Sequence, residues 1–235
     1  VFSIAGPKSR NFLKKLVVSE DPDKTLSNKQ FPWLSYRDIE IGMCPVRALR
    51  VAYTGELGWE LHHPIEMQNY LLDILLSSGK EFNLKLVGAR AQNWLRQEKS
   101  YKAFGSDLGR DAGPFESNLS RFVDINKNFL GKDALLKRKT EVSCVTLLID
   151  GPKDIDPWGR EALYNETEEV MLGRLTSAGY SVHFKRSIGI GYVKSSFSEV
   201  GTKLRIKIDD AFWNAEIVRD SPYDPENERV IDRAQ

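Results

Sequence analysis

The sequence has few cysteines, and they are widely separated. Its 235 residues include two, Cys44 and Cys144. Two isolated thiols do not make the disulfide framework of a small secreted domain, and neither has a nearby second sulfur with which to form a zinc-binding pair. We therefore expect both to be buried as small apolar residues, and we expect no metal site built on them.

The sequence also lacks an excess of charge and any long apolar run. There are 34 Lys and Arg against 33 Asp and Glu, a net charge of +1, whereas nucleic-acid-binding proteins usually show a strong basic excess. The longest apolar candidate, Tyr70 to Leu76, is interrupted by Asp73 and falls short of the roughly 20 residues needed to cross a bilayer. We expect neither a nucleic-acid nor a membrane partner.

The N-terminus lacks both a methionine and a signal-peptide pattern. The chain enters at Val1 directly on an apolar stretch that runs to Pro7. We expect it to be a piece of a longer protein. The expected location is cytoplasmic, or the mitochondrial matrix if the source is eukaryotic.

Common catalytic signatures are missing as well. The sequence contains no glycine-rich dinucleotide fingerprint, no phosphate-binding loop, no His-Glu-x-x-His and no Gly-x-Ser-x-Gly. His62 and His63 are adjacent, so on a strand they point to opposite faces and cannot bind one metal ion together. We predict no metal site and assign no catalytic residue.

What is present is a globular composition, 41% hydrophobic and 10% aromatic, whose first half mixes strands and helices. The pattern predicts a strand and then a helix around Gly6-Pro7, and a polar loop over 20–35. A hairpin of strands 45–53 and 59–62 follows. Apolar spacing predicts helices over 67–78 and 87–97, the first ending at Gly79 in a left-handed cap.

The second half is rich in short β segments separated by Gly, Pro and Asp. Strands are predicted at 142–149, 170–176, 188–193, 203–208 and 212–218, a pattern typical of a small β-barrel or sandwich. The change of pattern near residue 140 predicts a domain boundary there. We expect an α+β protein with one domain over 1–139, a mixed α/β portion, and a second over 140–235.

The most informative segment is Tyr53-Thr-Gly-Glu-Leu-Gly-Trp-Glu-Leu61. If Trp59 and Leu61 face a core, Glu60 faces the other way, and Tyr53 can line the same cleft from across the hairpin. Taken alone, a strand glutamate is usually just a solvated residue. Glu56 falls in the turn, where we expect it to stay hydrated.

Eight segments, taken in order, resemble the aminomethyltransferase (glycine-cleavage T-protein) family over nearly the whole chain. The blocks Tyr-Thr-Gly-Glu-x-Gly-x-Glu and Phe-x-Gly-Lys-x-Ala-Leu are the specific ones. Within the family, the chain is most similar to the C-terminal folate-binding region of dimethylglycine and sarcosine dehydrogenases. The segments are Ala5–Arg10, Tyr53–Leu61, Leu95–Lys99, Gly105–Leu108, Pro114–Leu119, Phe129–Leu135, Leu175–Tyr180 and Ile190–Val193, and the ending Ser221–Pro225 also matches.

This resemblance implies a site for the pterin of tetrahydrofolate, with Tyr53 and Glu60 at the matching positions, and a C-terminal β-barrel closing one side of the folate cleft. In such proteins an upstream domain of the same chain carries FAD and oxidises the methylated amine. The carbon of the resulting imine is captured as 5,10-methylenetetrahydrofolate. The implied partners are therefore folate and that flavin domain. The alternative is a non-catalytic folate-binding or regulatory module of the same build.

The chain departs from the family pattern at two places. Gln92 stands where glycine-cleavage members have a second folate-binding arginine, and the family's catalytic aspartate lies upstream of Ala5. The resemblance therefore implies that the α/β folate-binding portion, residues 1–139, is incomplete at its N-terminus and that this chain is inactive alone. Arg96 and Glu98 also match the family, but we expect them to pair with neighbouring residues in a structural role.

Overall fold

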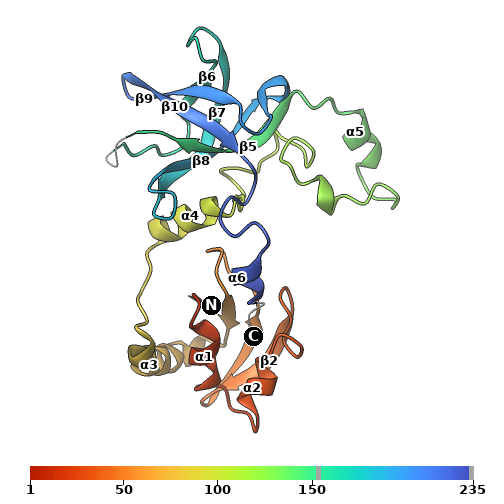
Figure 1. Cartoon of the computed structure of the whole chain (residues 1–235). Helices are drawn as coiled ribbons and strands as arrows, with labels where there is room; N and C mark the ends of the chain where they lie inside the picture. The colour runs from red at the N-terminus through yellow and green to blue at the C-terminus, as the bar shows by residue number, and fades with distance from the viewer. Residues whose placement is uncertain (152–154, 233–235) are drawn as a thin grey trace. The chain divides into compact units, whose positions relative to one another are not determined.

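A computed structural model describes residues 1–151 and 155–232 of the chain. Its contacts divide it into two compact units, Val1–Gln92 with Asp224–Gln235, and Asn93–Tyr223. Figure 1 shows both, coloured along the chain. The mixed helix and strand content and a closed C-terminal barrel confirm the predicted α+β class. The boundary that the sequence pattern sets at residue 139 stays a prediction about domains.

The first unit is built on a four-stranded antiparallel sheet of order β1-β4-β3-β2. The predicted hairpin is confirmed as β3 paired with β4, but its first strand ends at Leu49 and not at Tyr53, so Tyr53 lies in the connecting loop. β2 was not predicted, because half of its residues are charged and only Ile41 is buried, which leaves little apolar alternation to read from the sequence. The strands are β1 (Phe2–Ala5), β2 (Tyr36–Ile41), β3 (Cys44–Leu49) and β4 (Gly58–His62).

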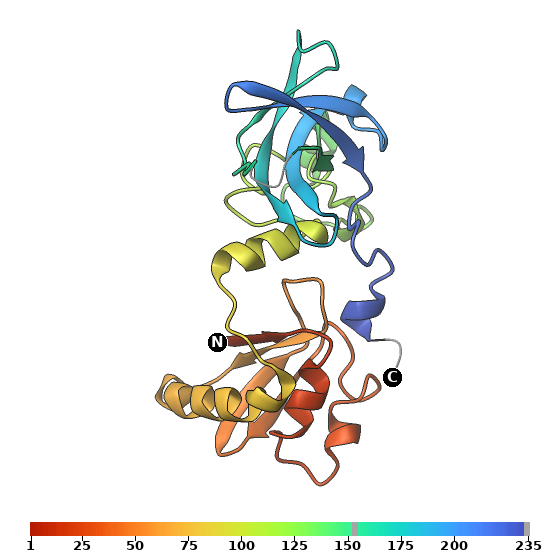
Figure 2. The same ribbon diagram turned by 60° about the vertical axis from the view of Figure 1, so that its left-hand side comes forward.

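Helices α1 (Ser9–Lys14) and α3 (Gln68–Gly79) cover one face of this sheet (Figure 2). They bury an apolar core against the inward residues of the strands. The segment predicted as a polar loop contains a short helix, α2 (Pro22–Thr25), and buries two apolar anchors. Residues of this core include Phe12, Leu13, Leu26, Phe31, Val46, Ala48, Trp59, Leu61, Leu71 and Leu75.

The left-handed cap predicted at Gly79 is wrong. Gly79 has a helical φ of −71°, and Asn83 adopts the left-handed conformation instead, with a φ of 57°. Glycine is needed at position 79 for another reason: a Cβ there would lie 2.7 Å from the Cβ of Leu84. The chain therefore continues past α3 into a short 3-10 turn before it leaves the helix axis.

The second unit contains the barrel, closed in the order β10-β5-β8-β7-β6-β9. The five predicted strands are present, and the three-residue strand β6 was missed because it is too short to show alternation. Closure pairs each barrel strand with a neighbour on both sides. Of the two predicted alternatives, the structure is therefore a barrel and not a sandwich. The strands are β5 (Val142–Ile149), β6 (Ala162–Tyr164), β7 (Met171–Ser181), β8 (Arg186–Lys194), β9 (Lys203–Ile208) and β10 (Ala211–Val218).

Helix α4 (Ala89–Glu98) begins at the end of the first unit and packs on the barrel with its C-terminal turns. Gly179 of β7 permits this contact, because a Cβ there would lie 2.0 Å from the Cδ1 atom of Trp94. The remaining short elements are α6 (Glu228–Ile231) and the 3-10 turns η1 (Ile65–Met67), η2 (Lys80–Phe82), η3 (Ser120–Phe122) and η4 (Ser195–Phe197). No helix in the described ranges is both long enough and apolar enough to cross a membrane.

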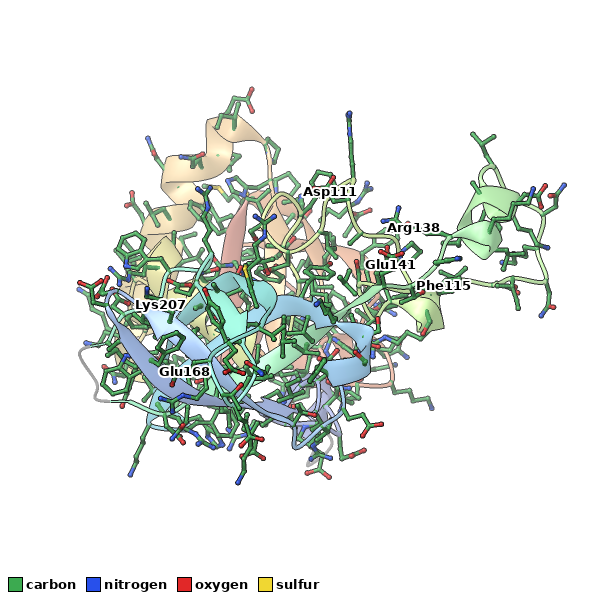
Figure 3. All side chains as sticks on the ribbon, turned by 90° about the horizontal axis from the view of Figure 1, so that it is seen from above. Asp111, Phe115, Arg138, Glu141, Glu168 and Lys207 are labelled. Atoms are coloured by element: carbon green, nitrogen blue, oxygen red, sulfur yellow. The ribbon has the colours of Figure 1, made fainter. Side chains whose placement is uncertain are left out.

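An arm that includes α5 (Lys132–Lys137) extends from the barrel, as Figure 1 and the view from above in Figure 3 show. Its base is closed by an ion pair between Arg138 and Glu116, 2.7 Å apart, and by a hydrogen bond from Arg138 to the carbonyl of Asp111. The Phe-Leu-Gly-Lys-Asp-Ala-Leu segment lies on this arm.

A buried ion pair joins α4 to the barrel. Arg96 Nη1 lies 2.6 Å from Asp107 Oδ2, and Arg96 Nη2 donates to the hydroxyl of Ser177 at 2.8 Å. The other Asp107 oxygen accepts from the hydroxyls of Thr176 and Ser177 at 2.5 and 2.6 Å. The expectation that Arg96 pairs with a neighbour is therefore confirmed.

Replacing Arg96 with alanine should destabilise the chain by roughly 3–5 kcal/mol, because it leaves a buried carboxylate without its cation. Arg186→Ala is the control, since it removes an exposed partner of Asp150 and should cost about 0–1 kcal/mol. Urea denaturation of the two variants and the wild type measures both values. Equal losses would contradict the role of the buried pair.

Candidate functional site

The strand β4 presents its side chains to two different environments. Trp59 and Leu61 are fully buried in the core, whereas the side chain of Glu60 between them is 36% exposed. This confirms the alternation predicted from the sequence. β4 is an inner strand, and Glu60 is paired with Ser3 on one side and Leu49 on the other. Backbone pairing on both sides holds the position of Glu60 more firmly than an edge strand would.

The Glu60 carboxylate contacts one ring nitrogen, Nε2 of His62, at 3.3 Å. An ionised carboxylate has about four acceptor sites, so this contact leaves others for a ligand. His63 instead places Nδ1 3.0 Å from the carbonyl of Leu61 and stacks on Phe2. Within the described ranges, no group of three or more His, Cys, Asp and Glu side chains is arranged to hold a metal ion.

Residues 50–57 join β3 to β4, and we call them the Tyr53 loop. Tyr53 is half-buried, and Gly55 has a positive φ of 77°, which glycine adopts without strain. The hydroxyl oxygen of Thr54 is buried and has no hydrogen-bond partner among the described residues. Whether Tyr53 and Glu60 open into one concave space stays a prediction.

Glu56 differs from the sequence interpretation. Its side chain is only 20% exposed, and its Oε1 lies 3.4 Å from Nη1 of Arg229, on α6. The motif places Glu56 in a turn, but a contact with a residue far along the chain is invisible to local sequence reasoning. Glu56 is therefore partly desolvated and paired, rather than freely hydrated.

Two buried arginines, Arg10 and the first loop residue Arg50, pack against Trp59, and sequence reasoning missed the role of both. The guanidinium carbons of Arg10 and Arg50 lie 5.5 and 5.8 Å from the ring centre of Trp59. Burial lowers the pKa of Arg50 to about 10, helped by Arg10 and opposed by Asp232. Arg50 therefore remains charged at neutral pH. Arg10 belongs to the Ala-Gly-Pro-Lys-Ser-Arg segment, but its partner, Asp232, lies at the other end of the chain.

Three further residues were singled out from the sequence: Cys44 lies on β3 of this sheet, Gln92 on α4 and Cys144 on β5 of the barrel. Gln92 is half-buried on α4. Cys44 and Cys144 are both buried, as expected, and burial raises the pKa of the Cys144 thiol to about 12. A thiol with such a pKa stays protonated at neutral pH and is a poor nucleophile.

Two family models match the chain in succession. The GCVT N-terminal domain matches residues 1–127, more than half of the chain. The glycine cleavage T-protein C-terminal barrel domain matches residues 143–224, which include the six barrel strands except for Val142, the first residue of β5.

Curated relatives cover most of this chain but only part of their own length. Dimethylglycine dehydrogenase from Mus musculus is 37% identical over 227 residues, which is 94% of this chain and 25% of that protein. An aminomethyltransferase from Caldanaerobacter subterraneus subsp. tengcongensis is 31% identical over 94% of this chain and 58% of its own length. Sarcosine dehydrogenase from Mus musculus is 28% identical over 98% of this chain, again spanning 25% of that protein.

A solved structure supports the fold independently. The glycine cleavage system aminomethyltransferase from Bartonella henselae superposes with a TM-score of 0.73 over 87% of this chain and 56% of that one, at 21% identity. The chain thus spans about a quarter of the length of the dehydrogenases that it matches, and more than half of the aminomethyltransferases.

Proposed function

The chain belongs to the glycine cleavage T-protein (aminomethyltransferase) family, and from this premise we propose that it is a tetrahydrofolate-binding region of a dimethylglycine or sarcosine dehydrogenase-like protein. In this proposal Glu60 and Tyr53 contact the pterin. The observation that carries the proposal is the succession of two T-protein family models along one chain. The subgroup is supported by the identity to dimethylglycine dehydrogenase, 37% against 31% to the aminomethyltransferase.

The residues present suit a pterin. One edge of the pterin offers adjacent N–H and amino donors, and a carboxylate accepts them through two parallel bonds. Glu60 is half-exposed with unused acceptor sites, and it faces away from the apolar core. Tyr53 offers an aromatic surface with a hydroxyl, and the buried Thr54 oxygen beside it still needs a donor.

In the proposed reaction the protein contributes binding and orientation. Tetrahydrofolate, when bound, would accept the carbon of an imine made by amine oxidation in a separate FAD-containing domain, giving 5,10-methylenetetrahydrofolate and releasing the demethylated amine as the bond from that carbon to the substrate nitrogen breaks. Glu60 holds the pterin in one register because its backbone is fixed by strands on both sides. A fixed pterin orientation places the folate amine next to the incoming carbon. The two groups then react from a defined geometry and not through random collision.

The proposed partners are a reduced folate and the flavin domain of the same parent chain. The flavin domain follows from the small share of the dehydrogenases that this chain spans. A mitochondrial matrix location is proposed by analogy with the mitochondrial dimethylglycine dehydrogenases, if the source is eukaryotic, and a cytoplasmic one otherwise.

Glu60→Gln should weaken binding of 5-formyltetrahydrofolate by about thirtyfold or more, since losing one partner of a desolvated, charge-assisted hydrogen-bonded pair costs roughly 2–5 kcal/mol. Glu40→Gln is the matched control, because Glu40 is an exposed glutamate on β2 of the same sheet. Calorimetric titration gives the affinities, and thermal unfolding checks that both variants fold. Equal affinity of wild type and Glu60→Gln would exclude the pterin clamp, and a wild type that binds no folate would contradict the proposed function.

The purified chain should not oxidise dimethylglycine or sarcosine, even with FAD added. The sequence contains no dinucleotide fingerprint, so the proposal assigns amine oxidation to another domain. Reduction of a dye acceptor by the chain and each amine measures this. Turnover that depends on added flavin would show that the assignment of roles is wrong.

A further inference from the structure

The sheet of the first unit has one face that is not used for the core. The core residues of β4, Trp59 and Leu61, lie on the face that packs against α1 and α3 (Figure 2). Glu60 points to the opposite face, which we call the open face. In an antiparallel sheet, residues directly opposite each other on neighbouring strands point to the same side. The residues paired with Glu60 therefore share the open face.

One row of side chains crosses the open face at Glu60. It runs from β1 through β4 and β3 to β2, and its members, each paired with the next, are Ser3, Glu60, Leu49 and Tyr36. None of the four is buried within the described chain. From Glu60 toward the edge strand β2, the row thus presents a carboxylate, then an aliphatic side chain, then an aromatic ring.

The Tyr36 ring is oriented and yet open to solvent. The guanidinium carbon of Arg47 lies 5.4 Å from the ring centre. Arg47 is itself fixed by two hydrogen bonds to the Asp38 carboxylate, at 2.9 and 3.2 Å. Tyr36 nevertheless remains 63% exposed. The ring therefore has a preferred orientation while much of its surface is available to a ligand.

Leu34 adds a second exposed apolar side chain at the same end of the sheet. It is 67% exposed, and its amide donates to the carbonyl of Arg50 at 3.2 Å. Arg50 is the first residue of the Tyr53 loop, so this end of the sheet adjoins the loop. Single exposed apolar residues are common on protein surfaces and need no function. Here Leu34, Tyr36 and half-buried Leu49 form a patch next to the proposed pterin contacts.

The row suits the part of a reduced folate that follows the pterin. Neighbouring strands lie about 4.8 Å apart, so two spacings separate Glu60 from Tyr36 by roughly 10 Å. A folate joins its flat pterin to an aminobenzoyl ring through a short methylene–amine bridge. With the amino edge of the pterin on Glu60, a ligand lying across the strands carries its bridge over Leu49 and its second ring to Tyr36.

We propose that the open-face row is a subsite for the aminobenzoyl part of the folate, with the Tyr36 ring stacked on it and Leu49 packed under the bridge. The inference rests on the proposed function for its ligand. Two aromatic rings in contact contribute beyond the area that they bury, and a ring that is already oriented loses little freedom on binding. The subsite therefore distinguishes folates from pterins that lack the aminobenzoyl group.

Tyr36→Ala should weaken binding of 5-formyltetrahydrofolate roughly fivefold to thirtyfold, because the ligand loses its stacking partner. Tyr36→Phe keeps the ring and should bind as the wild type does. Met43→Ala is the matched control, since it removes another large exposed apolar side chain, in the turn at the other end of β2. Calorimetric titration gives the affinities, and thermal unfolding checks that each variant folds.

A second ligand separates this subsite from the pterin contact. 6-Methyltetrahydropterin has the reduced ring system but no aminobenzoyl group, and ligand-observed NMR titration detects its binding even where it is weak. Tyr36→Ala should bind it as the wild type does, whereas Glu60→Gln should bind it more weakly. The loss in Tyr36→Ala should thus appear only with the ligand that carries the second ring.

The outcomes separate the subsite from the proposed function. Wild-type affinity of Tyr36→Ala for 5-formyltetrahydrofolate would overturn the subsite, as would an equal loss with both ligands or an equal loss in Met43→Ala. Binding that still depends on Glu60 would then leave the proposed function standing. If the truncated pterin binds no variant, the folate affinities of Tyr36→Ala and Tyr36→Phe decide. A wild type that binds neither ligand contradicts the proposed function, and the subsite falls with it.

Discussion

Alternation along β4 is the constraint on which the site depends. Successive strand residues point to opposite faces, so burial of Trp59 and Leu61 in the core commits Glu60 to the other face. A shift of the strand register by one residue would bury the Glu60 carboxylate and expose the Trp59 indole. The free energy lost would exceed what any new surface contact could contribute. The core of the first unit therefore fixes the orientation of the proposed pterin contact before any ligand binds.

Charged groups buried behind that core extend the constraint to distant parts of the chain. Arg10 and Arg50 approach Trp59, and they donate hydrogen bonds to the backbone carbonyls of Leu26, Phe31 and Ile231. A buried guanidinium needs acceptors, and backbone carbonyls from three segments supply them. In the barrel unit, Arg96 and Asp107 do the same for α4. In both units, buried arginines thus connect segments that are remote in sequence.

Local patterns predicted much of this architecture. The strand predictions 142–149 and 203–208 agree with β5 and β9, and the hairpin and the helix that became α4 were also correct. β2 and β6 were missed because one is rich in charged residues and the other has three residues. The left-handed cap at Gly79 was wrong because close approach to Leu84 explains that glycine. Contacts such as Glu56 with Arg229 join distant residues, and no periodicity reports them.

The motif Tyr53–Leu61 drew attention to Glu60, but only the family resemblance gave it a role, because a half-exposed glutamate on a strand has no distinctive local signal. The central claim of the site prediction is that Glu60 and Tyr53 receive the same ligand. A crystal structure of the chain with 5-formyltetrahydrofolate tests this most directly. The account predicts the amino edge of the pterin within hydrogen-bond distance of the Glu60 carboxylate, with the Tyr53 ring against the same molecule. A pterin bound elsewhere, or Tyr53 and Glu60 on separate convex surfaces, would contradict it.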